Sequence, residues 1–164
     1  MTKPSQRTLL LGLGNDLLTD DAIGLRVAAA VSQGLPDRPD VVVQQSSEMG
    51  LALLDLVAGF EEVVIVDAVQ TGHAPHGFVH ELDGRDLRVL PLVSPHFLGI
   101  GEVLALGERL GLAMPRSVKI LAVEVQDPFT VGTQMTPNLE TALPAICQRV
   151  HEALGSVARS RDAD

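Results

Sequence analysis

Residues 9–24 read LLLGLGNDLLTDDAIG and combine an apolar run, a Gly-x-Gly turn and the start of a helical pattern. Residues 8–13 have the length of a buried strand, and the apolar residues of DDAIGLRVAAAVSQG recur at the spacing of a helix that stops at Gly34. A buried strand that leads through a short loop into a helix is the opening unit of a parallel sheet. This stretch therefore predicts an α/β fold.

The strand and helix pattern repeats in the next part of the chain. Residues 41–45 form a second short strand, Ser47 is the expected cap of the helix within SSEMGLALLDLVAGF, and residues 62–69 form a third strand that is buried on both faces. This β-α-β-α-β order predicts parallel strands joined by right-handed crossovers, in the spatial order 2-1-3.

The second half of the chain departs from this alternation. The segment QTGHAPHG (70–77) contains too much Gly and Pro for a helix, so GFVHELDG (77–84) is expected to return as an antiparallel edge strand. A helix is expected to begin at Ser94 and Pro95, and the strand SVKILAVEVQ (117–126) follows it beside the third strand. The sequence therefore predicts a mixed five-stranded sheet in the order 2-1-3-5-4, with the fourth strand antiparallel.

The C-terminal part of the chain carries one more helix. It is predicted to begin at Thr136-Pro137 and to kink at Pro144, and the tail 155–164 is expected to fray. The 164 residues include no linker, repeat or low-complexity segment. We therefore expect a single domain over residues 1–164 with its core over 8–154.

Charge and composition exclude two classes of partner. The chain has 21 Asp and Glu residues against 12 Lys and Arg, which gives a net charge of −9. Binding to a phosphate backbone needs a surplus of positive charge, so no nucleic acid is expected as a partner. No apolar run is long enough to cross a membrane, and the N-terminal MTKPSQR lacks the pattern of a signal peptide. We expect a cytoplasmic protein with no membrane contact.

The Gly-x-Gly at Gly12 and Gly14 raises the question of a dinucleotide site. The dinucleotide fingerprint needs a third glycine where Leu17 stands, and Asp20 and Asp21 put negative charge near the helix start, where a pyrophosphate would have to bind. A dinucleotide-dependent oxidoreductase is therefore the weakest functional interpretation.

Acidic and imidazole side chains from distant parts of the chain are expected at the carboxyl edge of the sheet. Asp20 and Asp21 follow the first strand, Asp67 lies at the end of the third, and His96 lies in the first turn of the helix that leads into the last strand. Ligands of open α/β sheets bind at this edge, where the strand order reverses. Carboxylates and imidazole together suit nickel or zinc. The pattern therefore predicts a site for a divalent cation.

Each of these residues also has a structural interpretation. The aspartates can cap the helix or accept amide hydrogen bonds, and a histidine can simply be satisfied at a helix terminus. Convergence of the residues on one crevice favours the cation site. Glu124 and Asp127 either add acidity to the same edge or belong to a solvated turn. The remaining candidates are expected in a solvated loop, because Gly and Pro interrupt them: His73, His76 and His80.

Three motifs, GLGNDLLTDDAIG (12–24), VVIVDAV (63–69) and SPHFLGI (94–100), resemble in this order the nickel–iron hydrogenase maturation endopeptidases. The resemblance implies a three-layer α/β/α sandwich and an endopeptidase that removes the C-terminal extension of the hydrogenase large-subunit precursor after nickel insertion. It also implies that Asp21, Asp67 and His96 are the metal contacts and the candidate catalytic residues. The nickel is expected to arrive with the precursor, which is the implied partner.

One segment departs from the family pattern. Many members carry Asp-Gly-Gly-Thr after the second strand, where this chain has Gln45-Ser46-Ser47-Glu48. Because Gln45 cannot act as a carboxylate base, that Asp is dispensable, or Glu48 replaces it, or the chain serves a different hydrogenase. A non-catalytic nickel-binding chaperone of hydrogenase assembly is the second interpretation. In either case we expect a monomer.

Overall fold

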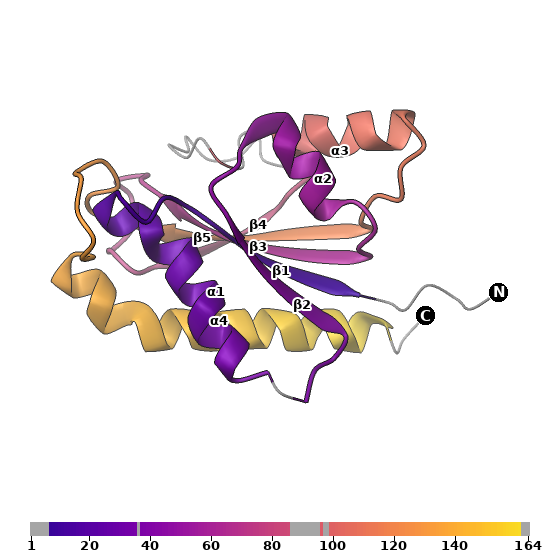
Figure 1. Ribbon diagram of the computed structural model, residues 1–164. Coiled ribbons are helices and arrows are strands. Elements are labelled where there is room, and N and C mark those ends of the chain that lie inside the picture. The colour runs from indigo at the N-terminus through magenta and orange to yellow at the C-terminus, as the bar shows by residue number, and fades with distance from the viewer. Residues whose placement is uncertain (1–6, 36, 86–95, 97–98, 162–164) are drawn as a thin grey trace.

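The computed structural model describes residues 7–35, 37–85, 96 and 99–161, which form a mixed sheet with helices on both faces (Figure 1). The strands are β1 (Thr8–Leu13), β2 (Val41–Ser46), β3 (Glu62–Val69), β4 (Val79–Asp83) and β5 (Ser117–Glu124). The helices are α1 (Ile23–Gln33), α2 (Leu53–Val57), α3 (Ile100–Arg109) and α4 (Pro137–Arg161), with short 3-10 helices η1 (Thr19–Ala22) and η2 (Gly50–Ala52).

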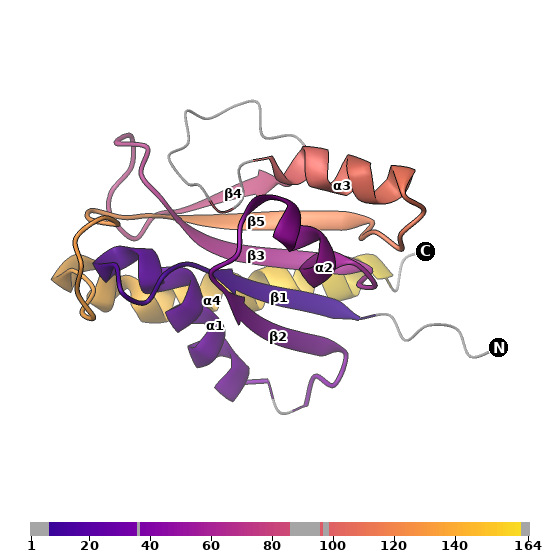
Figure 2. The same ribbon diagram turned by 45° about the horizontal axis from the view of Figure 1, so that its top comes forward.

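The strand order is β2-β1-β3-β5-β4, which confirms the predicted order. β1 pairs in parallel with β2 and β3, β3 pairs in parallel with β5, and β4 runs antiparallel to β5 at the edge. β1 and β3 are buried along their whole length because they lie inside the sheet and helices cover both of their faces. The carboxyl ends of β1 and β3 therefore open at the same edge of the sheet (Figure 2).

Two apolar clusters fill the space between the three layers. On one face, α1 and α4 pack against the sheet through residues such as Val27, Val64 and Val150. On the other face, α2 and α3 pack against residues such as Ile65 and Ile120. The three-layer α/β/α sandwich is thus the observed fold. Among the described residues, none of the helices combines the length and the apolar character that crossing a membrane requires.

The glycines at the start of the chain allow α1 to pack directly on the sheet. A Cβ atom at Gly24 would overlap the carbonyl oxygens of Leu13 and Val66, and one at Gly12 would overlap the carbonyl oxygen of Gly24. Backbone therefore touches backbone where α1 crosses β1 and β3. This contact brings the loop before α1, with its two aspartates, against the end of β3.

Two predicted helix starts are wrong. Ser47 does not cap a helix, because η2 begins at Gly50 and no side chain caps it. Ser94 and Pro95 lie outside the described residues, and α3 begins at Ile100 because Gly99 before it has the left-handed φ of +81°. His96 therefore lies in the segment that precedes α3 and not in its first turn.

The C-terminal helix is longer than predicted. α4 continues through Pro144 to Arg161. Residues 155–161 are therefore helical, where fraying was expected. The apolar positions Ile146, Val150 and Val157 follow one face of this helix and are buried against the sheet. Burial of Val157 explains why the helix does not stop where the core was expected to end. A kink at Pro144 stays a prediction.

Candidate functional site

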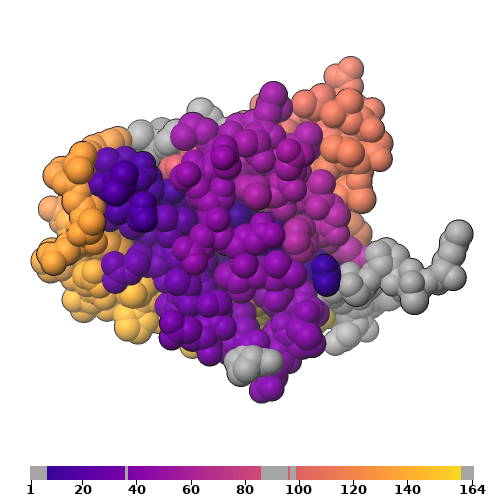
Figure 3. Space-filling view, in the orientation of Figure 1, coloured from indigo at the N-terminus to yellow at the C-terminus, as the bar shows by residue number. Residues whose placement is uncertain are grey.

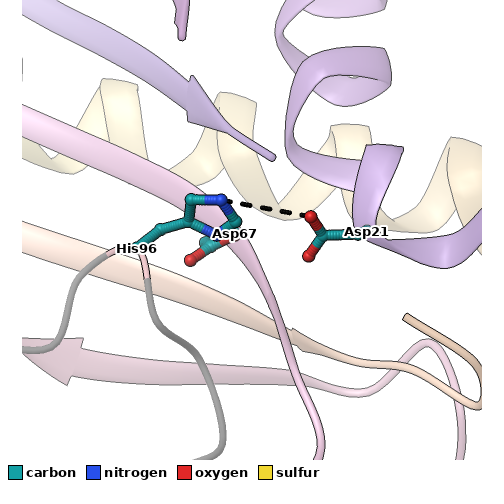
Figure 4. A group of neighbouring side chains, drawn as sticks. All are labelled: Asp21, Asp67 and His96. Carbon is teal, nitrogen blue, oxygen red and sulfur yellow. Dashed lines mark ion pairs between the residues drawn. The ribbon is translucent and has the colours of Figure 1, made fainter. Parts of the chain in front are cut away.

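Three side chains from separate parts of the chain meet at the carboxyl edge of the sheet, as Figure 4 shows. Asp21 comes from η1, Asp67 from β3, and His96 from the segment before α3. One ligand atom of each lies within 4.8 Å of the others, and all three residues are buried. The sequence prediction that these residues converge is thus matched by the geometry, and a single cation can touch all three.

The histidine stands between the two carboxylates. Its Nδ1 lies 3.3 Å from Asp67 Oδ1, and its Nε2 lies 4.0 Å from Asp21 Oδ2. Asp67 Oδ1 also accepts a hydrogen bond of 2.8 Å from the Ala68 N–H. The buried Nδ1 makes no well-aligned hydrogen bond to any described residue. A buried imidazole nitrogen in that state is suited to binding an ion.

Burial and mutual charge shift the ionisation of this group. Burial raises the pKa of Asp21, the negative charge of Asp67 raises it further, and His96 opposes both. The contact with Asp67 raises the pKa of His96, although burial acts in the opposite direction. Two buried carboxyl groups therefore lie close to one imidazole, and a divalent cation bound among them would favour their ionised form.

The other aspartate of the pair has a different function. The Asp20 carboxylate is fully buried and accepts four hydrogen bonds, from the backbone of Gln126, Asp127 and Thr136 and from the Thr136 hydroxyl. These bonds tie the loop after β5 and the start of α4 to η1. Asp20 is therefore a structural anchor, and Asp21 alone faces the site.

Glycine also positions Asp21. A Cβ atom at Gly14 would overlap the carbonyl oxygen of Asp21, so the turn after β1 can fold back on η1 only because residue 14 has no side chain. The nearby Asn15 backbone N–H acts to lower the pKa of the Asp21 carboxyl, against the effect of burial. The Gly-x-Gly motif thus serves the carboxylate and not a phosphate.

A second polar cluster lies beside the site, and sequence reasoning identified only part of it. Glu124 is buried at the end of β5 and accepts hydrogen bonds from the Thr71 and Gly72 backbone, the Thr71 hydroxyl and His80 Nε2. Of the two interpretations of Glu124, added acidity at this edge or a solvated turn, the solvated turn is wrong, because Glu124 is buried. His80 lies in β4, within the edge strand predicted over 77–84, so its placement in a solvated loop with His73 and His76 is wrong.

The cluster shares a face of the sheet with Asp67. Asp67 pairs with Ala122 on β5, and Ala122 pairs with His80 on β4, so the three side chains lie in one row. Glu124, two residues after Ala122, points to the same face. The Glu124 bonds therefore fix the loop after β3 close to Asp67.

The remaining candidates lie away from the three ligands. His73 and His76 are exposed in the loop between β3 and β4, as predicted. Asp127 belongs to a turn, because its carboxylate accepts hydrogen bonds from the backbone of Phe129 and Thr130. Glu48 is exposed just beyond β2, so it does not join the buried site.

A groove of about 460 Å³ opens beside the site at the ends of β1 and β2. Its lining comes from the loop after β1, from α1 and from the end of β2. The lining residues are Gly14, Asn15, Asp16, Leu17, Leu25, Gln45, Ser46 and Ser47. Gln45, which replaces the expected loop aspartate, is thus part of the groove wall and not one of the three ligands.

Comparison with known proteins agrees with this geometry. The profile of the hydrogenase maturation proteases matches residues 25–153. The chain belongs to the hydrogenase maturation protease family.

Individual members of the hydrogenase maturation protease family align along nearly the whole chain. The hydrogenase 2 maturation protease of Escherichia coli is 31% identical in an alignment of 159 positions that covers 90% of this chain and 95% of that protein. The hydrogenase expression/formation protein HupD of Thiocapsa roseopersicina is 28% identical over 94% of this chain and 72% of its own length.

A solved structure of the family has the same fold. The hydrogenase maturating endopeptidase HybD of E. coli superposes with a TM-score of 0.75 at 30% identity, over 92% of this chain and 93% of that chain. This maturation protease is accordingly a peptide-bond hydrolase.

Proposed function

We propose that this hydrogenase maturation protease removes the C-terminal extension from the precursor of a nickel–iron hydrogenase large subunit once nickel has been inserted. The observation that carries the proposal is the convergence of Asp21, Asp67 and His96 within 4.8 Å at the carboxyl edge of the sheet. The names of the E. coli relatives connect this fold with hydrogenase maturation.

In this proposal the three side chains bind the nickel that the precursor carries. Asp21 and Asp67 supply carboxylate oxygens, and His96 supplies a ring nitrogen, a set that borderline divalent ions accept. Three protein ligands leave positions for groups of the precursor itself. A bound divalent ion can polarise the carbonyl of a peptide bond or lower the pKa of a water molecule.

The residues of this chain would orient the scissile bond. Asp67 is held by the Ala68 N–H, and the backbone of Asp21 is held against the turn at Gly14, so both carboxylates are positioned before the precursor binds. His96 must lose the proton that its acidic neighbours favour before it can bind an ion. The two carboxylates attract the positive charge that replaces that proton.

Incubation with nickel-loaded precursor, followed by measurement of the intact mass, tests the proposal. We expect the unaltered protein to shorten the precursor, and His96→Ala or Asp67→Asn to abolish the cleavage while circular dichroism stays native. His73→Ala changes an exposed histidine and should leave cleavage unchanged. Normal cleavage by both site variants would overturn the assignment.

The same assay separates the protease from a nickel-binding chaperone. A chaperone would bind the precursor through the same three residues and leave its mass unchanged. The monomeric state and the cytoplasmic location expected from the sequence stay predictions, which sedimentation and cell fractionation test.

A further inference from the structure

Three large apolar side chains are exposed next to the site, and we call them the apolar patch: Leu17, Phe129 and Val131. Their exposed fractions are 62%, 65% and 81%. They come from the loop before η1 and from the loop between β5 and α4. These two segments lie side by side in Figures 1 and 2 and adjoin one another at the left of Figure 3.

The backbone that carries the apolar patch is fixed by hydrogen bonds. Leu18 and Val131 form an antiparallel bridge, and the Gly132 N–H donates to the Leu17 carbonyl at 2.9 Å. The Phe129 N–H donates to Asp127 Oδ1 at 3.1 Å. The apolar side chains are therefore held on an ordered backbone. Binding of a partner would cost less conformational entropy than it would at a flexible loop.

The apolar patch is tied to the ligand set through Asp20. The buried Asp20 carboxylate holds the backbone of Gln126, Asp127 and Thr136, which brackets the loop that carries Phe129 and Val131. The next residue, Asp21, faces the site. The loop that carries Phe129 and Val131 and the 3-10 helix that carries Asp21 are thus fixed to one another through the Asp20 carboxylate.

Charge around the apolar patch favours a particular kind of partner. Asp16 is exposed beside Leu17, and the chain as a whole has a net charge of −9. An exposed apolar patch beside an acidic side chain, on a protein of net negative charge, fits a partner with an apolar strip bordered by basic side chains.

We propose that the apolar patch is the docking surface for the protein substrate whose peptide bond is presented to Asp21, Asp67 and His96. The inference rests on the proposed function, because it takes the hydrogenase large-subunit precursor as the occupant. Docking of the precursor body on the patch places its C-terminal region over the neighbouring ligands. The patch contributes to binding of the precursor and takes no part in the chemical step.

Serine substitutions measure this contribution. Leu17→Ser and Val131→Ser remove exposed apolar groups, and Leu110→Ser is a matched control, because Leu110 is also 62% exposed but follows α3 at the opposite end of the sheet. Binding of nickel-loaded precursor is measured by biolayer interferometry, and its cleavage by intact mass. Thermal unfolding verifies that each variant is folded.

We expect Leu17→Ser and Val131→Ser each to weaken binding and to raise KM by about tenfold with kcat nearly unchanged, as for a contact made equally in the ground and transition states. Leu110→Ser should bind as the unaltered protein does. Equal binding by all variants would overturn the docking surface even if cleavage is normal.

Other results separate the inference from the function on which it rests. Tight binding without cleavage, weakened by the patch variants, supports the docking surface and overturns the protease. No binding by the unaltered protein overturns both. A dimer that dissociates on Leu17→Ser, seen by sedimentation, would make a second copy of this chain the occupant and would overturn the proposal.

Discussion

Asp20 and Asp21 are adjacent in the sequence, yet their carboxylates lie in opposite environments. The Asp20 carboxylate accepts four hydrogen bonds that hold the loop after β5, whereas the Asp21 carboxylate lies 4.0 Å from His96 Nε2. The turn of η1 sends consecutive side chains in different directions, so one stabilises the fold and the other faces the site. Substitution of Asp20 is therefore expected to affect stability, whereas substitution of Asp21 is expected to affect ion binding.

Asp20→Asn is expected to destabilise the protein. An amide has only one acceptor oxygen, and its NH2 group would face donors that now bond to the second carboxylate oxygen. Hydrogen bonds to a buried charged group contribute about 1.5–3 kcal/mol each, so we expect a loss of about 3 kcal/mol in the free energy of unfolding. Urea titration measures it. Asp16→Asn, at an exposed aspartate, should change stability by less than about 0.5 kcal/mol.

Asp21→Asn is expected to stabilise the protein and to abolish nickel binding. Burial raises the pKa of Asp21, so its charge is disfavoured in the fold at neutral pH. Removal of that charge should raise the free energy of unfolding by up to about 1 kcal/mol at pH 7, and the gain should vanish as pH falls below the unfolded pKa. Nickel binding, measured by calorimetry, should be lost. A variant that binds nickel normally would contradict the ligand assignment.

The Glu124 cluster predicts acid sensitivity. Burial alone would raise the pKa of Glu124, but hydrogen bonds from Thr71, His80 and Gly72 outweigh it and lower the pKa. The stabilisation is therefore present above the unfolded pKa and is lost as pH falls through the lower folded pKa. Glu124→Gln should cost about 2 kcal/mol at pH 7, with a smaller difference below about pH 4. Glu48→Gln is the exposed control. A difference that did not depend on pH would contradict this account.

The close contact between α1 and the sheet predicts that a methyl group added at Gly24 is not tolerated. Gly24→Ala would force Cβ into the carbonyl oxygens of Leu13 and Val66, so we expect a loss of about 3 kcal/mol or more, or no folded protein. Gly155→Ala is the matched control, because a Cβ at Gly155 in α4 would make only an ordinary contact of 3.8 Å with the Arg159 side chain, and alanine favours helices. That variant should gain about 0.5–1 kcal/mol in thermal unfolding. Equal stability of the two variants would contradict the close packing.

Strand order and the convergence of the candidate site residues were accessible from the sequence because they depend on regular patterns. Continuous apolar runs identify β1 and β3 as interior strands, and their carboxyl ends must meet at one edge. Asp67 was conspicuous because a charged residue stands within an apolar strand. The motif around residues 94–100 added His96.

Other features depend on contacts that no local pattern reports. The sequence did not separate the anchor Asp20 from Asp21 by residue type, since both are aspartates at the same helix start. The burial of Glu124 depends on β4, which lies far from it in the sequence but pairs with β5. The start of α3 depends on the backbone conformation of Gly99. The C-terminal helix exceeds its expected length because Val157 reaches the tertiary core.

Asp21, Asp67 and His96 lie in three distant segments, and this has a consequence for the folding of the protein. No two of them lie within one helix or one strand, so a nascent or partly folded chain offers no pair of ligands from this set to a passing ion. Capacity to hold an ion arises only when β1, β3 and the segment before α3 have come together. In the proposed function an ion therefore binds only to the folded chain, and its binding would stabilise that chain through linkage.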